Sequence, residues 1–236
     1  MSTVAALLTR DHDGKPLTAP LHNGDRFTQS EFHRRYLAYP EDVKFELICG
    51  IVYMASPLGL PHGTHHLELG TLLTLYKGAT PGVEAGDNAT IILGEDSEPQ
   101  PDLMLRILPA FGGQSRTTDD GYIAGPPELV IEVAHSSVAI DLHAKKDDYR
   151  KAGVIEYIVV CIDDQAVRWF DLSADQSRQP DVEGILRAAT FPGLWIDTGA
   201  LMRKDTNKLV EVLRQGLASS EHKQFVLRLE QVGGVK

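Results

Sequence analysis

A glutamate stands in the middle of an apolar run near the centre of the chain. In the stretch PELVIEVAHSS, residues 127–137, Glu132 interrupts a segment that otherwise has the composition of a buried β-strand. Strand alternation places its side chain on the face of Val130 and Ala134, and both faces of such an apolar strand are buried. A buried, ionised carboxylate is costly unless a cation, a metal ion or several donors compensate it. Either a neighbouring basic group satisfies Glu132 structurally, or the carboxylate belongs to a functional site.

Two other charged residues could form that site with Glu132. Asp102 follows a proline at the start of the apolar segment LMLRI, where it is either a turn residue or a ligand at a strand entry. Lys145 lies in the segment DLHAKKDDYRKA. In a helix with about 100° per residue, it falls on the inward stripe of Leu142 and Tyr149. It is either a snorkelling lysine with its head in water or the cation that reaches Glu132.

Glu46 and a group of histidines are further candidates. Glu46, in the segment FELI, is either an exposed strand residue or an additional acid of the site. His62, His65 and His66 could suggest a metal site. However, His62 and His65 are three residues apart on one helical turn and no third ligand is evident, which favours core or surface histidines.

The chain as a whole has the composition of one sizeable α/β domain. Its 236 residues are 42% hydrophobic, which suffices for a full core. The net charge of −10 argues against a broad basic surface for nonspecific nucleic-acid binding. Two cysteines are too few for a disulfide framework, and no apolar stretch approaches the length of a membrane span. We therefore expect a cytoplasmic protein with no membrane association.

Periodicity and turn residues predict strands and helices in a layered arrangement. Two β-rich runs around Cys49 and Gly50 are typical of a hairpin, and apolar residues at three-to-four spacing over residues 61–79 predict an amphipathic helix. The expected helices are 28–39, 61–79, 140–153, 209–218 and 222–232, and the expected strands are 43–48, 51–56, 88–94, 101–108, 129–133, 155–162 and 166–172. One crossover helix after residues 129–133 predicts a mixed sheet in an α/β fold.

Five segments, taken in order, resemble one protein family. They are FELICGIVYMASP, PHG, QPDLML, PELVIEV and DLHAKKDDYRKAGVIEYIVV. The ordered set, from about Phe27 to about Asp171, is similar to the Uma-type endonucleases, restriction-endonuclease-like proteins of the PD-(D/E)XK nuclease superfamily. The segment FPGLWID followed by ALM resembles the family's C-terminal continuation. In the general superfamily pattern a lysine lies two residues after the acid; here that residue is Ala134, and Lys145 matches the lysine of this family. The chain also lacks the proline that usually follows the family's glutamate.

The resemblance implies a restriction-endonuclease-like core of the α/β or α+β class, with a mixed β-sheet flanked by helices. Residues 1–26, which carry Gly and Pro among polar residues, are expected to form a loosely ordered leader. Residues 27–200 would form the nuclease-like domain. Residues 201–236 would be a C-terminal helical extension packed on the same domain.

The same resemblance implies a Mg²⁺-dependent endonuclease that hydrolyses phosphodiester bonds of DNA, with Mn²⁺ as the alternative ion and RNA as the alternative substrate. The residues implied are Asp102, Glu132 and the backbone carbonyl of Val133 as metal ligands, Lys145 as a further catalytic group, and Glu46 and His62 as additional groups. Glu46 matches the family's N-terminal acid, and His62 matches a recurring histidine that would line the cleft. Carboxylates suit Mg²⁺, and Lys145 would orient or deprotonate the attacking water or neutralise the phosphate.

Two hypotheses of different classes follow. The first is an active endonuclease that works as a homodimer, because two symmetric sites cut both strands of a duplex most simply. The second is a noncatalytic module that keeps the nuclease fold and serves partner binding or assembly. The acidic net charge and the lack of an obvious basic stripe favour the second hypothesis. The combination of Asp102, Glu132 and Lys145 favours the first.

Overall fold

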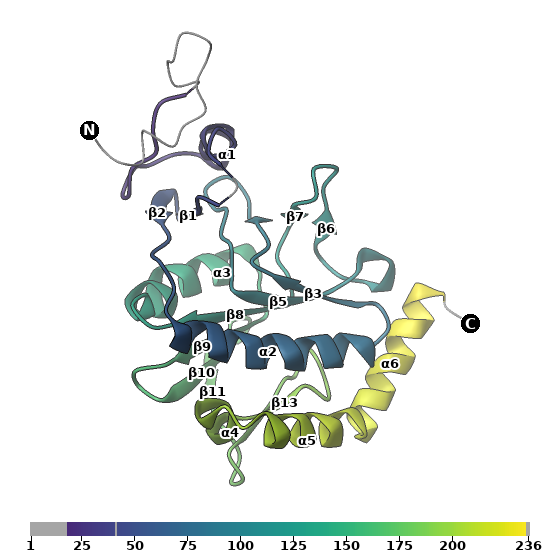
Figure 1. The fold of residues 1–236 in the computed structure, drawn as a ribbon. Coiled ribbons are helices and arrows are strands. Elements are labelled where there is room, and N and C mark those ends of the chain that lie inside the picture. Colours follow the sequence, from purple (N-terminus) through teal and green to yellow (C-terminus); the bar gives the residue numbers. More distant parts are fainter. Residues whose placement is uncertain (1–17, 41, 235–236) are drawn as a thin grey trace.

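A six-stranded mixed β-sheet forms the centre of the computed structural model, which describes residues 18–40 and 42–234 (Figure 1). Its strands are β3 (Val83–Asp87), β5 (Leu103–Ile107), β8 (Leu129–Ala134), β9 (Glu156–Cys161), β10 (Ala166–Asp171) and β11 (Gln176–Arg178). Their spatial order is β11-β10-β9-β8-β5-β3, and only the β8–β9 pair within this sheet is parallel. The chain crosses from β8 to β9 through the π-helical turn η3 (Ile140–Lys145) and helix α3 (Lys146–Ala152). The predicted mixed sheet with one helical crossover is confirmed.

Further helices and three small sheets surround this sheet. The other helical segments are α1 (Gln29–Tyr36), α2 (Leu60–Gly78), the 3-10 turn η2 (Pro109–Phe111), α4 (Thr198–Arg203), α5 (Thr206–Leu217) and α6 (Ser220–Gly233). The small sheets are the hairpin β1 (Phe45–Ile48) and β2 (Ile51–Met54), the set β4 (Ile91–Ile92), β7 (Ile123–Ala124) and β6 (Arg116–Thr117), and the pair β12 (Ile185–Arg187) and β13 (Trp195–Asp197). None of the helices within the described residues is long and apolar enough to cross a membrane.

Two apolar cores lie on the two faces of the main sheet. Alternate residues of β8 divide between them, because successive side chains of a strand point to opposite faces. Leu129 and Ile131 belong to the core beneath α2, whereas Val130 packs in the second core with Tyr149 of α3. Every residue of β8 and β9 is buried. This double burial explains the continuous apolar run in which Glu132 stands.

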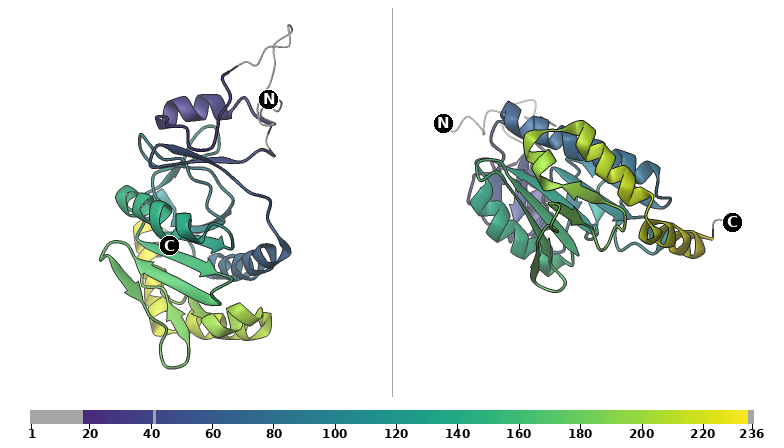
Figure 2. Two further views of the ribbon diagram at one scale, coloured as in Figure 1. Left: turned by 90° about the vertical axis from the view of Figure 1, so that its left-hand side faces the viewer. Right: turned by 90° about the horizontal axis from the view of Figure 1, so that it is seen from below.

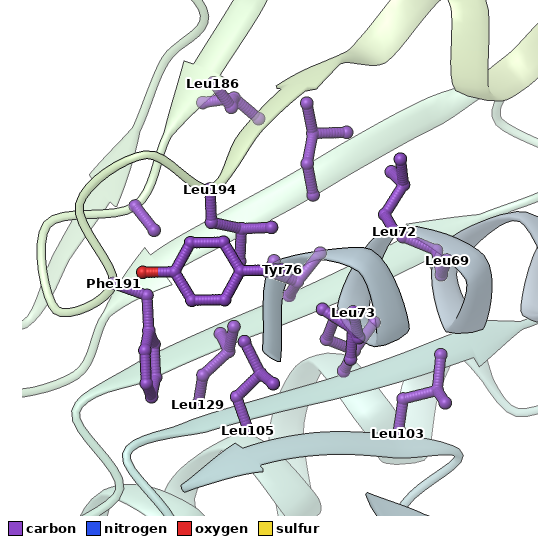
Figure 3. Close-up of a cluster of buried hydrophobic side chains, with 14 of the residues drawn as sticks. Leu69, Leu72, Leu73, Tyr76, Leu103, Leu105, Leu129, Leu186, Phe191 and Leu194 are labelled. Atoms are coloured by element: carbon purple, nitrogen blue, oxygen red, sulfur yellow. The ribbon is translucent and has the colours of Figure 1, made fainter. Parts of the chain in front are cut away.

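The buried face of α2 organises the larger of the two cores. Its members recur at the predicted spacing and are His62, His65, Leu69, Leu72, Leu73 and Tyr76. Figure 3 shows Tyr76 beside Leu194 and Phe191, above the leucines of the sheet. The hydroxyl of Tyr76 donates a hydrogen bond to the backbone carbonyl of Pro192 at 2.9 Å, so the one polar atom of this ring is satisfied. The predicted amphipathic helix is confirmed.

The first hairpin turns tightly and docks on the acidic loop before β5. Cys49 and Gly50 have φ values of 50° and 75°, as a two-residue turn with both central residues in the left-handed region requires. Leu47 then exchanges two backbone hydrogen bonds with Glu98. The predicted hairpin is confirmed, and its docking fixes Glu46 close to the start of β5.

The two ends of the described chain pack on the rest of the protein. The last two helices, α5 and α6, are close to those predicted, and α5 lies alongside α2 (Figure 2). Leu209, Leu213, Phe225 and Leu229 join the core beneath α2. At the other end, most of the expected leader, residues 1–17, lies outside the described residues, while Leu21 is fully buried with the hairpin.

Some elements differ from the prediction. Strands β3 and β11 and helix α4 were not expected. The sequence of β3, VEAGD, contains glycine and acidic residues that are rare in strands. Pairing along the whole length of β5 holds it in the sheet instead. Tertiary pairing therefore outweighs local propensity at this edge.

The core beneath α2 gives a direct stability test. We expect Leu73→Ala to lower the free energy of unfolding by about 2–5 kcal/mol, because a cavity remains where a buried leucine is removed. Leu73 is 1% exposed, whereas Leu67 on the same helix is 70% exposed. The matched variant Leu67→Ala should therefore change the value by less than about 0.5 kcal/mol. Urea unfolding followed by circular dichroism measures both, and equal effects would contradict this packing of α2.

Candidate active site

A cavity of about 630 Å³ opens where the first hairpin, the start of α2 and the end of β8 meet. Its wall contains Glu46, His62, Asp102, Glu132 and Lys145, which are all the side chains that the family resemblance implied for the site, and also Val133. These residues come from distant parts of the chain. The fold therefore brings the whole predicted set to one place.

A second cavity, of about 860 Å³, lies on the other side of the hairpin turn. Two of its three acidic residues, Asp96 and Asp148, are already bonded within the protein. Lys151 pairs with Asp96 at 2.7 Å, and Asp148 accepts the Ser97 hydroxyl at 2.5 Å. None of the predicted site residues lines it. The smaller cavity is therefore the candidate site, although the other one is larger.

The carboxylate of Glu132 is buried and uses one of its two oxygens for hydrogen bonds. Lys145 Nζ donates to Glu132 Oε1 at 3.0 Å, and the Tyr149 hydroxyl donates to the same oxygen at 2.9 Å. The other oxygen, Oε2, receives only a long contact of 3.5 Å from the backbone N–H of Asp102. Lys145 is thus the cation that compensates the buried glutamate, and Oε2 keeps capacity for a further partner.

Lys145 holds three carboxylates together. Besides Glu132, its Nζ lies 2.9 Å from Glu46 Oε1 and 3.8 Å from Asp141 Oδ1. Glu46 Oε1 also accepts the backbone N–H of Gln100 at 2.8 Å. The lysine side chain is 7% exposed, so its head does not reach bulk water as a snorkelling lysine would. The structure therefore excludes the interpretation of Lys145 as a snorkelling lysine.

Asp102 is held at the entry of β5 by a backbone donor and a histidine. Its Oδ2 accepts the backbone N–H of Val133 at 2.7 Å and lies 3.2 Å from His62 Nε2. Burial by itself raises the pKa of Asp102, but the contacts with His62 and the Val133 N–H outweigh burial and lower the pKa overall. Asp102 is therefore ionised at neutral pH.

The backbone of Val133 faces the same part of the cavity. Its N–H points past the end of β5 to Asp102. In a strand the N–H and C=O of one residue point to the same side, so the Val133 carbonyl is directed there too. The next carbonyl along, that of Ala134, bonds to Ile162 on the opposite side. The Val133 carbonyl oxygen is thus a third oxygen donor beside the carboxylates of Asp102 and Glu132.

The cluster contains more acids than cations. Burial raises the pKa of Glu132 well above its usual range; Lys145 opposes this, while Asp141, Asp102 and Glu46 add to it. Burial alone would lower the pKa of Lys145, but the surrounding carboxylates raise it well above its usual range. Lys145 therefore stays protonated, and the excess negative charge of the cluster contributes to the raised pKa of Glu132.

The available donors fit a hard divalent cation. Glu132 Oε2, the Asp102 carboxylate and the Val133 carbonyl are oxygen ligands of the kind that Mg²⁺ takes, together with waters. A cation beside Asp102 and Glu132 would also offset the excess negative charge of the cluster. The residues present therefore fit the metal ligand set expected from the sequence.

A π-helical turn directs Asp141 and Lys145 into the cavity. A regular helix was predicted over residues 140–153, but the chain is π-helical over η3 and α-helical only in α3. The residue that caps the C-terminus of α3, Gly153, has a φ of 99°. Both Asp141 and Lys145 are buried. Such π-helical turns are rare and occur frequently at functional sites. The sequence predicted a helix here, but it did not predict that residues 140–145 would be π-helical.

Two residues that contact Glu132 or Asp102 were not assigned to the site from the sequence. Tyr149 was expected only as a core residue, yet its hydroxyl bonds to Glu132. His66 was grouped with its neighbours, but its Nδ1 lies 3.7 Å from Asp102 Oδ1. The signal that could have identified His66 is its spacing of four residues from His62, which places both rings on one helix face.

Removal of the central cation tests this electrostatic account. We expect Lys145→Met to lower the free energy of unfolding by about 3–5 kcal/mol at pH 8 with EDTA present, because buried carboxylates lose their partner. The loss should be smaller at pH 5. The folded-state pKa of Glu132 is raised. The stability that such an acid contributes is fully present below its unfolded pKa and is lost as the pH rises through the folded pKa.

The control for this test is the neighbouring residue. Lys146→Met makes the same chemical change in a lysine that lies over the Phe170 ring at 4.6 Å, outside the acidic cluster. Its effect should be much smaller and nearly equal at the two pH values. Urea unfolding at pH 5 and pH 8 measures both variants. A Lys145→Met penalty that did not grow with pH would contradict the charge balance described above.

Comparisons with known proteins agree with this geometry. A family model described as "Putative restriction endonuclease", Uma2, matches residues 30–199. Among solved structures, the crystal structure of "a putative nuclease belonging to DUF820" from Anabaena variabilis aligns with a TM-score of 0.55 and 17% identity, covering 72% of this chain and 97% of that chain. No curated protein matches the chain significantly. The structural likeness confirms the predicted restriction-endonuclease-like fold, and because the family model spans most of the sequence, the chain belongs to the Uma2 family.

Proposed function

We propose that the protein is a Mg²⁺-dependent endonuclease that hydrolyses phosphodiester bonds of DNA, and that Mn²⁺ can replace Mg²⁺. The observation that carries this proposal is the meeting of Glu132 Oε2, the Asp102 carboxylate and the Val133 carbonyl beside a buried lysine. Membership of the Uma2 family supports it. The fold alone would not, since one fold serves many functions.

Each residue of the cluster has a role in this proposal. A bound divalent ion would supply a nucleophilic water and offset charge that develops on the phosphate. Asp102 and Glu132 would hold that ion. Lys145, whose pKa is raised by the surrounding acids, would act as a cation and hydrogen-bond donor toward the phosphate or the water, rather than as a base. Glu46 would position Lys145, and His62 would orient Asp102.

The charge of the cavity wall supports a need for metal. Among the described residues, its Asp and Glu residues are Asp42, Glu46, Asp102, Glu132 and Asp141, its Lys residues are Lys44 and Lys145, and no Arg lines it. A phosphodiester is itself anionic, so such a wall repels it unless cations are held there. A noncatalytic module would tolerate the same acidic wall. A cleavage assay therefore distinguishes the two hypotheses.

Cleavage assays test the proposed activity. Supercoiled plasmid and single-stranded DNA should be cut in the presence of Mg²⁺ or Mn²⁺ and left intact with EDTA. We expect Asp102→Asn and Glu132→Gln each to lower the cleavage rate by at least about a hundredfold, the scale at which a positioned catalytic group contributes. Asp148→Asn is the matched control: it makes the same change in a buried aspartate outside the candidate site, and it should cut at the wild-type rate.

The hypothesis of a noncatalytic module predicts the opposite result. If the purified wild type does not cut any of these DNAs with either ion, or if Asp102→Asn and Glu132→Gln cut as fast as it does, the nuclease proposal is wrong. The acidic cluster would then be a retained structural ion-pair network within a binding module.

A homodimer belongs to the same proposal. Two copies related by a twofold axis would present one cavity to each strand of a duplex. Sedimentation equilibrium of the full chain should then give about twice the 25.9 kDa of one copy. A protein that remains monomeric while it converts supercoiled plasmid directly to the linear form would contradict this expectation.

A further inference from the structure

Two histidines of α2 face Asp102 on the side away from Glu132. His62 and His66 are four residues apart, and therefore lie one above the other on the same face of the helix. His62 Nε2 lies 3.2 Å from Asp102 Oδ2, and His66 Nδ1 lies 3.7 Å from Asp102 Oδ1. One donor atom from each of the three residues lies within 4.8 Å of the other two. Two nitrogens and one carboxylate thus converge.

The spacing of these donors matches ligands of a common ion. Two ligands bound to one metal at about 2.0–2.2 Å stand roughly 3–3.6 Å apart in tetrahedral or octahedral geometry. The two measured nitrogen–oxygen separations lie close to that range. The rings of His62 and His66 are tilted by 62° with centroids 5.8 Å apart, so they do not stack on each other.

The surroundings of His66 support a ligand role for its Nδ1. Its other ring nitrogen, Nε2, lies 3.0 Å from Asp87 Oδ1, although the N–H is not aimed well enough for a regular hydrogen bond. A carboxylate beside the outer nitrogen is the arrangement that fixes the tautomer of metal-binding histidines. His62 is 5% exposed, and its Nδ1 has no hydrogen-bond partner among the described residues. Hydrogen bonding with the described residues therefore leaves one buried ring nitrogen of each histidine, His62 Nδ1 and His66 Nε2, without a partner.

We propose that His62, His66 and Asp102 form a second cation position, selective for transition metals such as Mn²⁺, Co²⁺ and Zn²⁺ over Mg²⁺. Imidazole nitrogen suits these ions, whereas Mg²⁺ prefers oxygen ligands and gives up its waters reluctantly. The position shares Asp102 with the oxygen-lined position in front of Glu132. Its two nitrogen donors belong to it alone, so it does not depend on the reaction proposed for the cavity.

Metal titration of the full-length, metal-stripped protein tests this site without any activity measurement. Zn²⁺ binding is followed by calorimetry and Co²⁺ binding by visible absorption. His66→Gln should weaken Zn²⁺ and Co²⁺ binding by at least about tenfold, since even the outer partners of metal ligands are worth that much. Mg²⁺ affinity should change by less than about threefold, because no nitrogen ligand is lost from an all-oxygen site.

Two controls locate the bound ion. His135→Gln removes a half-exposed imidazole that lines the same cavity but lies outside the cluster, and its Zn²⁺ and Co²⁺ affinity should equal that of the wild type. Cys49→Ser, titrated alongside, should also bind as the wild type does, because Cys49 is an exposed thiol that is not part of the site. Thermal unfolding of each variant verifies the fold.

The results separate this proposal from the one on catalysis. Wild-type binding of Zn²⁺ and Co²⁺ that is lost in His66→Gln and kept in His135→Gln supports the second position, whether or not DNA is cut. Binding unchanged in His66→Gln, binding equally reduced in His135→Gln or Cys49→Ser, or no binding by the wild type overturns it, even if cleavage with Mg²⁺ is intact.

Discussion

The buried contact between Lys145 and Glu132 determines how the cavity is built. The ammonium comes from the crossover after β8, Glu132 from β8 itself, and Glu46 from the first hairpin. A buried cation is tolerated only where its partners surround it. The hairpin, the central strand and the crossover must therefore meet at one point. Gln100, whose N–H binds Glu46, ties the entry of β5 to the same point, and the position of Asp102 follows from it.

This arrangement does not maximise stability. An isolated buried ion pair is often no better than well-packed apolar residues of similar size, and here several acids share one lysine. The raised pKa of Glu132, which results from burial and from its acidic neighbours, is a sign of that imbalance. Apart from Glu132 and Glu156, the surrounding strands β8 and β9 carry no charged residue, and they are buried at every position. Local choices that conflict with an otherwise consistent core are expected at functional sites.

The sequence predicted the elements whose signals are local. The stripe on α2, the two-residue hairpin turn and the apolar strands each depend on spacing within a few residues, and all were found. Strand β3 escaped because pairing with β5, rather than its own composition, makes it a strand. Glu132 could be identified as an anomaly in an apolar segment, Asp102 from its place at a strand entry, and Lys145 from its position on the inward stripe of a predicted helix. Their partners could not, because the contact of Tyr149 with Glu132 depends on the π-helical turn before α3.

Asp102 lies at the boundary between two chemically different halves of the cavity. On one side stand Glu132 Oε2 and the Val133 carbonyl, both hard oxygen donors; on the other stand the nitrogens of His62 and His66. Ligand softness and ion hydration, rather than net charge alone, decide which ion occupies each half. If both positions hold ions as proposed, the two ions would share the Asp102 carboxylate, and each would change the electrostatic field at the other. The identity and the order of the bound cations would then be coupled through this single side chain, and a phosphate would approach this acidic wall only when cations are present.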